Sequence, residues 1–416
     1  MEFHKTYDSG LKLIIKKMEG LFSVSTGILV GVGSRNETPD ENGISHFIEH
    51  VNFKGTKNRN AFEISDHIDR IGSSINAYTS KEATVYYTKA TYEHQEETFE
   101  ILADIFLNST YKQEELDKEK GVIIEEINMT EDTPDEVCLD ILSTAFYGDT
   151  GLGRTILGPI ENIKRFTRDD VLSYLERHYT PDNIIISVAG AVDVKKTVEL
   201  CDKYFGSFTG FGGKNKGNYE GFTTSLTNSL SKKKDIEQAH IALSFPGYRY
   251  GDSRANALSI ASSILGGSMS SRLFQKVREE LGLCYTVYSY LSQYKDTGKV
   301  EIYAGVNPEN RDKALDAIID VVKDFVKDGI TETEFARGKE QMKSAFIMSQ
   351  ESTSAQMQIY GKQYLILNEV FDFKKKIAEI NALTLKDVNN AINEAFNLDK
   401  VALATVGKND TPLKIN

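Results

Sequence analysis

Two histidines and a glutamate form the pattern His-x-x-Glu-His within the segment 43–51. In an α-helix, residues three and four positions apart share a face, so His46, Glu49 and His50 would point one way and the apolar side chains the other. Two imidazoles at this spacing can bind one Zn²⁺ through ring nitrogens, and a carboxylate between them can accept a proton from an attacking water. The pattern therefore predicts a helix with a packing face and a chemical face. The packing face would consist of Ile44, Phe47, Ile48 and Val51.

The alternative interpretation of this pattern is a chance match or a solvated helix face, because a match of this length needs structural context. The chain has only seven histidines in 416 residues. Two of them stand at metal-ligand spacing around a glutamate and opposite an apolar stripe. This context favours a metal site.

A third ligand is expected downstream, because a catalytic zinc usually takes three protein ligands and leaves a fourth position to water. The best candidate segment is 119–127. Glu119 and Glu126 are seven residues apart, so they fall on one face of a second helix, while Glu125 points elsewhere. The alternative is that these glutamates are ordinary surface charges. Two imidazoles and a carboxylate would also accept divalent ions other than zinc.

These motifs resemble the pitrilysin-type inverzincin zinc metallopeptidase family, and in particular the bacterial-type two-domain chains of its processing-peptidase-like branch. The resemblance implies that His46, His50 and Glu126 bind one Zn²⁺ per chain. It further implies that Glu49 is the catalytic base of a zinc metalloendopeptidase and that Glu119 supports the ligands from behind.

The segment 72–82 resembles the strand with which the family holds the substrate backbone, and this places Asn76 and Ala77 nearest the scissile bond. The following segment, 83–88, is rich in strand-forming residues. It favours an edge strand that a peptide extends by adding a strand of its own. A plain sheet strand is the alternative, because the sequence does not show which strand lies at an edge.

Two further residue pairs resemble family features. Arg278 and Tyr285 match a pair that assists at the substrate carbonyl and the tetrahedral intermediate, where a guanidinium and a phenol are suitable donors to an oxyanion. Glu136 and Asp140, four residues apart after Pro134, match an acidic pair that receives a substrate arginine. The second match implies a preference for basic residues near the cut. A solvated helix face is its alternative.

An internal repeat sets the expected architecture. Residues 167–190 align without gaps on residues 384–407, at an offset of 217. Each copy begins with a Thr-x-x-Asp helix cap, continues as a helix, turns near an aspartate and ends in an apolar strand closed by glycine. The repeat predicts two related domains of similar size.

The rest of the chain agrees with two domains. An apolar strand at 27–32 is answered by another at 240–245, and the latter is followed by a helix at 255–265 that has no histidine. We therefore predict an α+β fold of two homologous domains, each a mostly antiparallel sheet packed with helices. Residues 1–213 would bind zinc, and residues 214–416 would lack zinc ligands and supply Arg278 and Tyr285. The join is expected in the glycine-rich stretch 210–217.

Composition limits the class of protein. The hydrophobic fraction of 40% and the charged fraction of 26% are those of an ordinary globular chain. The sequence has no apolar run long enough to span a bilayer, and its start lacks the apolar core of a signal peptide, so we expect a cytoplasmic protein without a membrane partner. Three widely spaced cysteines suit a reducing compartment. A net charge of −12 disfavours nucleic acid and permits attraction of basic peptides.

The resemblance also implies partners. Long members of the family enclose a chamber with four such domains, so a two-domain chain is expected to form a homodimer that admits unstructured peptides. Arg278 and Tyr285 of one subunit would then serve the zinc of the other. A hetero-oligomer with a related chain stays open, as do a non-catalytic scaffold or partner subunit of the same fold and a peptide-binding module without activity.

Overall fold

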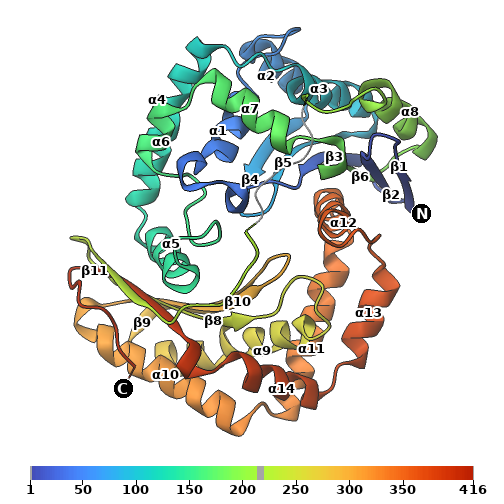
Figure 1. Cartoon of the computed structure of the whole chain (residues 1–416). Helices are drawn as coiled ribbons and strands as arrows, with labels where there is room; N and C mark the ends of the chain where they lie inside the picture. The colour runs from blue at the N-terminus through green and yellow to red at the C-terminus, as the bar shows by residue number, and fades with distance from the viewer. Residues whose placement is uncertain (1, 213–219, 416) are drawn as a thin grey trace. The chain divides into compact units, whose positions relative to one another are not determined.

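The computed structural model describes residues 2–212 and 220–415, which form two compact units that are each discontinuous in sequence (Figure 1). The first unit contains the described residues of Met1–Ile127, Thr155–Glu220 and Ile347–Phe371. The second contains those of Asn128–Arg154, Gly221–Phe346 and Asp372–Asn416. Each unit is built around one sheet.

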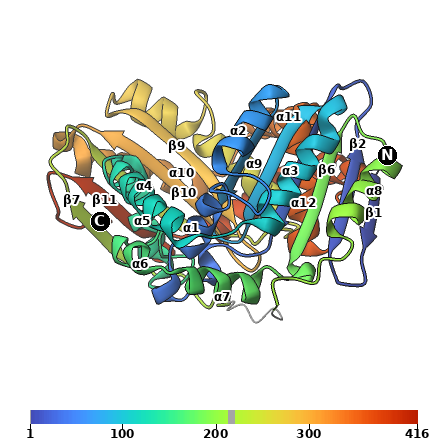
Figure 2. The same ribbon diagram turned by 90° about the horizontal axis from the view of Figure 1, so that it is seen from above.

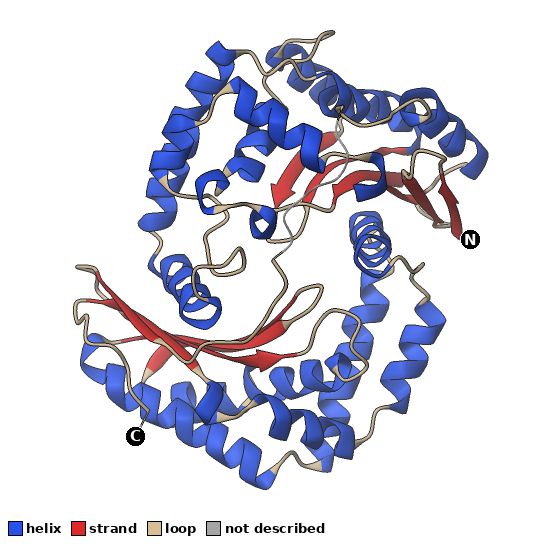
Figure 3. Ribbon diagram, in the orientation of Figure 1, coloured by secondary structure: helices blue, strands red, loops and turns tan. Residues whose placement is uncertain are grey.

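The sheet of the first unit has six strands in the order β1-β2-β6-β3-β5-β4. The strands are drawn in red in Figure 3. Only β2 and β6 pair in parallel, and every other neighbouring pair is antiparallel. The strand β4 therefore lies at one edge. The strand bounds are β1 Glu2–Thr6, β2 Lys12–Lys17, β3 Ser23–Val30, β4 Ser74–Thr79, β5 Thr84–Thr91 and β6 Ile184–Gly190.

Helices cover both faces of this sheet, because successive strand residues point to opposite sides. Ile28 packs with the core formed by α1, α3 and neighbouring helices, whereas Leu29 packs against Met357 of α12 on the other face (Figure 1). A Cβ at Gly27 would clash with the Met357 sulfur, so glycine permits the close approach of α12. The helices of the first unit are α1 Ile44–Val51, α2 Ala61–Arg70, α3 Gln95–Asn108, α6 Ile160–Arg165, α7 Arg168–His178, α8 Val194–Phe205 and α12 Thr353–Leu367, with the short turns η1 Ser34–Asn36, η2 Pro39–Glu41, η3 Tyr92–His94 and η4 Pro181–Asn183.

The second unit has a five-stranded sheet in the order β7-β11-β8-β10-β9. The pairing of β9 with β10 is visible in Figure 2. Ile241 and Leu243 of β8 pack with α9, α10 and α14, while Ala242 between them faces α5. The bounds are β7 Ser229–Lys233, β8 Ala239–Gly247, β9 Cys284–Gln293, β10 Gly298–Val306, β11 Ala402–Gly407, α5 Pro134–Tyr147, α9 Ala255–Gly266, α10 Arg311–Asp328, α13 Phe373–Ala382 and α14 Leu385–Ala395, with η5 Phe274–Glu280, η6 Pro308–Asn310 and η7 Leu398–Lys400.

The internal repeat has the same structure in both copies. Thr167 caps α7 and Thr384 caps α14, each accepting a hydrogen bond from the backbone N–H of the aspartate three residues on. The strand that follows each helix, β6 or β11, pairs in parallel with one neighbour and antiparallel with the other. The predicted α+β fold with two mostly antiparallel sheets is thereby confirmed.

Each half of the chain contributes one helix to the unit of the other half. Helix α5 comes from the first half and packs on β8 and β11, and α12 comes from the second half and packs on β3 and β6. The boundary between the two units falls within a long helix at two places in the chain, in α4 Gln113–Glu131 and in α11 Glu332–Ser349. The division of the chain into contiguous domains 1–213 and 214–416, each with one copy of the repeat, stays a prediction. Of the expected linker, residues 213–217 lie outside the described residues.

No helix in the described part of the chain combines the length and the apolar character that crossing a membrane requires.

Candidate active site

The predicted metal-binding helix is α1, and its two faces differ as the sequence indicates. The packing face is fully covered, since Ile44, Phe47, Ile48 and Val51 are at most 1% exposed. Gly43 precedes the helix with φ of 102°, and a Cβ there would lie 2.6 Å from the carbonyl oxygen of Leu157. Glycine is therefore required where the chain turns into the helix.

The start of α1 is held by a buried glutamate. The Glu37 carboxylate, 3% exposed, accepts hydrogen bonds from the backbone N–H groups of Gly43 and Ser45, both at 2.8 Å, and from the Asn42 side chain at 2.9 Å. Burial raises the pKa of Glu37, and these three donors only partly oppose that effect. The first turn of a helix leaves N–H groups without partners, and Glu37 supplies acceptors for two of them.

Helices α1 and α4 bring the predicted ligands together. The Glu126 Oε2 atom lies 3.6 Å from His46 Nε2 and 3.3 Å from His50 Nε2, and all three donor atoms are within 4.8 Å of one another. Ligands about 2.1 Å from a tetrahedral zinc are separated by about 3.4 Å. Two imidazoles and one carboxylate at these separations fit a zinc ion. His46, His50 and Glu126 are the only such group among residues 2–212 and 220–415.

His50 is oriented from behind by Glu119. Its Nδ1–H donates to Glu119 Oε1 at 2.9 Å, which leaves Nε2 free to face Glu126. Lys54 lies 2.7 Å from the other oxygen of Glu119. Burial raises the pKa of Glu119, but the hydrogen bonds from His50 and Lys54 outweigh burial and the net pKa is lowered. Glu119 is therefore an anion, which holds the ring of His50 in one tautomer.

The other ligand ring is neutral. Burial, followed by the nearby His50, lowers the pKa of His46 to about 3, so its nitrogen keeps a lone pair at neutral pH. For His50, burial lowers the pKa while the hydrogen bond to Glu119 and the charges of Glu126, Glu119 and Glu49 raise it, and the net shift is upward. The surrounding carboxylates therefore make His50 more basic than His46.

Glu49 lies on the same face as the two histidines and is half-buried. The Thr79 hydroxyl donates to its Oε2 at 2.6 Å. Burial raises the pKa of Glu49, and the hydrogen bond from Thr79 and the charge of His50 counteract only part of this effect. A carboxylate with a raised pKa beside a metal site is suited to accept and return a proton.

The candidate substrate strand is β4, which carries Asn76 and Ala77 and lies at the open edge of the sheet. Of the two interpretations of residues 83–88, the plain sheet strand is correct and the edge strand is wrong, because Thr84–Thr91 is β5, which pairs with β3 on one side and β4 on the other. Its strand-forming residues reflect burial in the sheet interior. Asn76 is exposed, and its side-chain oxygen accepts from the Ala77 backbone N–H at 2.8 Å.

The other predicted site residues belong to the second unit. Arg278 lies in η5, a π-helical turn, and its guanidinium carbon is 5.0 Å from the ring centre of Tyr285 and 4.5 Å from that of Phe274. Tyr285 is 76% exposed. The structure thus brings Arg278 and Tyr285 together. Glu136 and Asp140 both lie on α5, where Glu136 is exposed and Asp140 half-buried.

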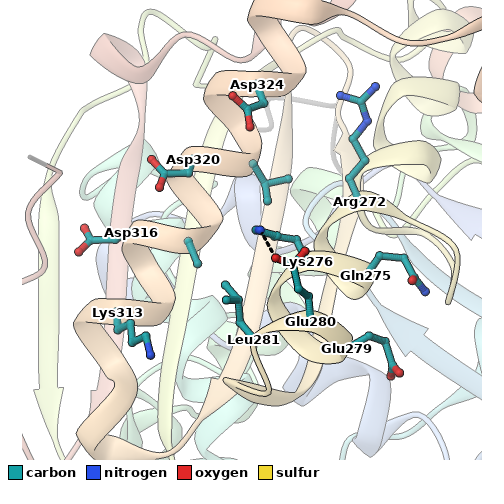
Figure 4. A pocket seen from close by; sticks show the side chains of 12 residues that line it. Arg272, Gln275, Lys276, Glu279, Glu280, Leu281, Lys313, Asp316, Asp320 and Asp324 are labelled. Carbon is teal, nitrogen blue, oxygen red and sulfur yellow. Dashed lines mark hydrogen bonds and ion pairs between the residues drawn. The ribbon is translucent and has the colours of Figure 1, made fainter.

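A hollow of about 850 Å³ lies beside η5 and α10 in the second unit (Figure 4). Three aspartates one helical turn apart, Asp316, Asp320 and Asp324, follow one side of α10, and Lys276 pairs with Glu280 across from them. None of the predicted site residues lines this hollow. We assign no ligand to it.

Three residues of the site carry no role in the sequence-based prediction: Glu37, Lys54 and Thr79. Acidic residues favour helix N-termini, but Glu37 lies six residues before Gly43, too far for a capping motif. Lys54 follows α1 by three residues. Thr79 reaches Glu49 only because β4 lies beside α1, and no local pattern predicts that contact.

Comparisons with known proteins show the family of this chain. Residues 14–160 match the family model for insulinase (peptidase family M16), and residues 165–342 match the model for the peptidase M16 inactive domain. An uncharacterized zinc protease of Bacillus subtilis, YmxG, is 42% identical over 96% of this chain and 97% of its own length. An uncharacterized zinc protease of Streptomyces coelicolor is 33% identical over 98% of this chain and 89% of its own length.

Two solved structures share the whole fold. A protease from Helicobacter pylori superposes on this chain with a TM-score of 0.89 at 25% sequence identity. The match covers 98% of this chain and 99% of the Helicobacter chain. An M16 inactive domain from Pseudomonas fluorescens has a TM-score of 0.90 at 18% identity, with 98% of each chain covered, and shows the fold alone. The chain belongs to peptidase family M16, the pitrilysin-type peptidases, with the two-domain architecture. The predicted family resemblance is confirmed.

Proposed function

We propose that this chain is a zinc-dependent endopeptidase that hydrolyses unstructured peptides in an enclosed chamber. The observation that carries the proposal is the convergence of His46 Nε2, His50 Nε2 and Glu126 Oε2, with the Glu49 carboxylate beside them and outside the ligand set. The relatives named zinc proteases support the same activity.

Each residue has a defined part in the proposed reaction. His46, His50 and Glu126 would hold one Zn²⁺ per chain, and the ion would polarise the scissile carbonyl and lower the pKa of the attacking water. Glu49 accepts the proton of this water and returns it to the leaving amine, a role worth roughly 10²- to 10⁴-fold. Glu119 keeps the ring of His50 in its ligating orientation.

The peptide would bind as an added strand at the edge of β4, with Asn76 and Ala77 nearest the scissile bond. The Ala77 N–H is bonded to the Asn76 side chain, so that side chain must move before this N–H can donate to a peptide. Glu136 and Asp140 on α5 would favour basic residues near the cut. Replacing Glu136 by Gln should then slow cleavage of an arginine peptide more than that of its norleucine counterpart.

Arg278 and Tyr285 are proposed to stabilise the tetrahedral intermediate as hydrogen-bond donors. In a homodimer they would act on the zinc of the partner subunit. A mixture of Glu49→Gln and Arg278→Ala proteins tests this arrangement, because mixed dimers would regain one complete site. Subunit exchange without recovered activity contradicts action in trans. A related chain in place of the second copy would form a hetero-oligomer.

The deciding experiment measures cleavage of a quenched, arginine-containing unstructured peptide together with bound zinc, for the wild type and for Glu49→Gln. About one zinc per chain in both proteins, with cleavage in the wild type alone, supports the peptidase. Glu49→Gln is the matched control, because it removes the base and keeps all three ligands.

The second candidate function is a non-catalytic scaffold or partner subunit. It is favoured by the match of residues 165–342 to a model described as an inactive domain. Absence of both zinc and cleavage, even after metal is added back, would support it. We further propose a cytoplasmic location, which imaging of a tagged chain in the source cell would test.

A further inference from the structure

Thr79 makes the hydrogen bond that holds the Glu49 carboxylate. The distance from its hydroxyl to Glu49 Oε2 is 2.6 Å, which is in the range of a charge-assisted O–H···O⁻ bond. An ionised carboxylate only accepts hydrogen bonds, so the Thr79 hydroxyl is the donor. Both side chains are half-buried, and the two residues are thirty positions apart in the sequence.

This bond fixes one oxygen and leaves the other open. Thr79 is the single hydrogen-bonding side chain found for Glu49 within residues 2–212 and 220–415. A glutamate has three rotatable bonds, so a base without such a contact would sample many orientations. With Oε2 held by Thr79, Oε1 is the oxygen that remains free to accept a proton.

Thr79 also belongs to the strand that would receive the peptide. Ser80 N–H donates to the Ala83 carbonyl, which closes the hairpin between β4 and β5. In an antiparallel pair, alternate residues bond to the neighbouring strand, so Tyr78 and Asn76 bond to β5. The backbone groups of Thr79 and Ala77 therefore point to the open edge.

We propose that Thr79 is the positioning residue of the catalytic base and couples the orientation of Glu49 to the strand on which the peptide docks. The proposal rests on the proposed endopeptidase function. The side chain of Thr79 orients Glu49, and the backbone of Thr79 lies at the edge that the substrate strand would extend. A peptide bound along β4 would thus be fixed relative to the oxygen that receives the proton.

The first test compares Thr79→Val, which keeps the shape and removes the hydroxyl, with Thr79→Ser, which keeps the hydroxyl. We expect Thr79→Val to lower kcat about 10- to 100-fold, the value of one hydrogen bond to a charged group, with KM and bound zinc unchanged. Thr79→Ser should retain kcat within about threefold. Thr91→Val, at the exposed end of β5 and outside the strand that would receive the peptide, is the matched control and should match the wild type.

Two kinetic results would overturn the proposal. One is a wild-type kcat in Thr79→Val. The other is an equal loss in Thr79→Val and Thr79→Ser, because that would assign the effect to packing of the strand.

A second test does not depend on activity. Hydrogen exchange of α1 in the metal-free protein is measured for Thr79→Val, for Glu49→Ala, which removes the acceptor, and for the double variant. Coupling of about tenfold between the two changes is expected if the side chains bond to each other. Independent effects overturn the contact. An inactive wild type that shows this coupling would refute the proposed function and leave the contact established.

Discussion

Replacement of Glu37 tests whether the buried carboxylate holds the metal-binding helix in place. In Glu37→Ala, the N–H groups of Gly43 and Ser45 and the amide of Asn42 lose their common acceptor. In Glu37→Gln, one oxygen is replaced by an NH₂ group that faces a donor. Both changes leave the chemical face of α1 unaltered in sequence.

The expected cost follows from the number of donors left unpaired. An unsatisfied buried donor costs about 1–3 kcal/mol. The best orientation of the glutamine keeps the oxygen that serves two donors and loses the Ser45 contact, so Glu37→Gln should cost about 1–3 kcal/mol. Glu37→Ala loses three contacts and leaves a cavity, and should cost about 3–5 kcal/mol.

Hydrogen exchange of the amides in Ile44–Val51 is the suitable assay, because it reports the opening of α1 separately from the rest of this two-unit chain. A cost of 1–3 kcal/mol corresponds to exchange about 5- to 150-fold faster, since 1.4 kcal/mol is tenfold. Zinc affinity should fall in the same order of variants, because binding must then restore the helix. Glu161→Gln, at an exposed glutamate, is the control for loss of charge.

The reasoning is refuted if α1 of Glu37→Ala exchanges at the wild-type rate. It is also refuted if Glu37→Gln is the more costly change, because the cost would then come from charge and not from unpaired donors.

Three further predictions concern the second unit. Lys299 and Glu301 form a buried ion pair at 2.7 Å. Lys299→Met leaves the Glu301 charge unpaired and should lower the free energy of unfolding in urea by about 3–5 kcal/mol. Adding Glu301→Leu should restore most of this stability, and a double variant as unstable as Lys299→Met would contradict the prediction. The hydrogen bond from Arg272 lowers the pKa of Glu334 from 4.5 to about 2. The ionised Glu334 therefore stabilises the fold by at most about 3 kcal/mol, and this stabilisation is present above pH 4.5 and lost as the pH falls towards 2. In Glu334→Gln, the free energy of unfolding should fall less steeply with pH below 4.5 than in the wild type, and an unchanged slope would refute the effect. On α10, Asp320 is repelled by the aspartates one turn before and one turn after it, and Asp320→Lys would form an ion pair with each of them. Thermal unfolding should show a gain in stability of about 0.5–1 kcal/mol, and a loss of stability would contradict this.

The metal motif was predictable because it is local. Residues three and four apart share a helix face whatever the rest of the chain does, so the sequence alone places His46, Glu49 and His50 on one side of α1 and its apolar residues on the other. Seven-residue spacing likewise predicts that Glu119 and Glu126 share a face of α4. The repeat was predictable for the same reason, since its caps, helices and strands are encoded within 24 consecutive residues of each copy.

Contacts between distant segments were not predictable. The choice of β4 as the edge strand depends on the order of six strands, and the strand-forming residues of 84–91 indicate burial without saying which neighbours cover them. Helix α5 packs on the sheet of the second unit and α12 on that of the first, and this choice depends on the sheet face that each helix contacts. Apolar spacing shows that a helix packs, and does not show its partner.

The sequence by itself therefore determined the ligand types, their helical spacing and the two-fold repeat of an α+β fold. Only the tertiary structure decided that Thr79 bonds Glu49, that Glu37 holds the start of α1 and that Glu126 reaches both imidazoles. The physical reason is that a helix sets the direction of its own side chains through local geometry. The distance between side chains on different elements is set by packing, which involves residues far apart in the chain.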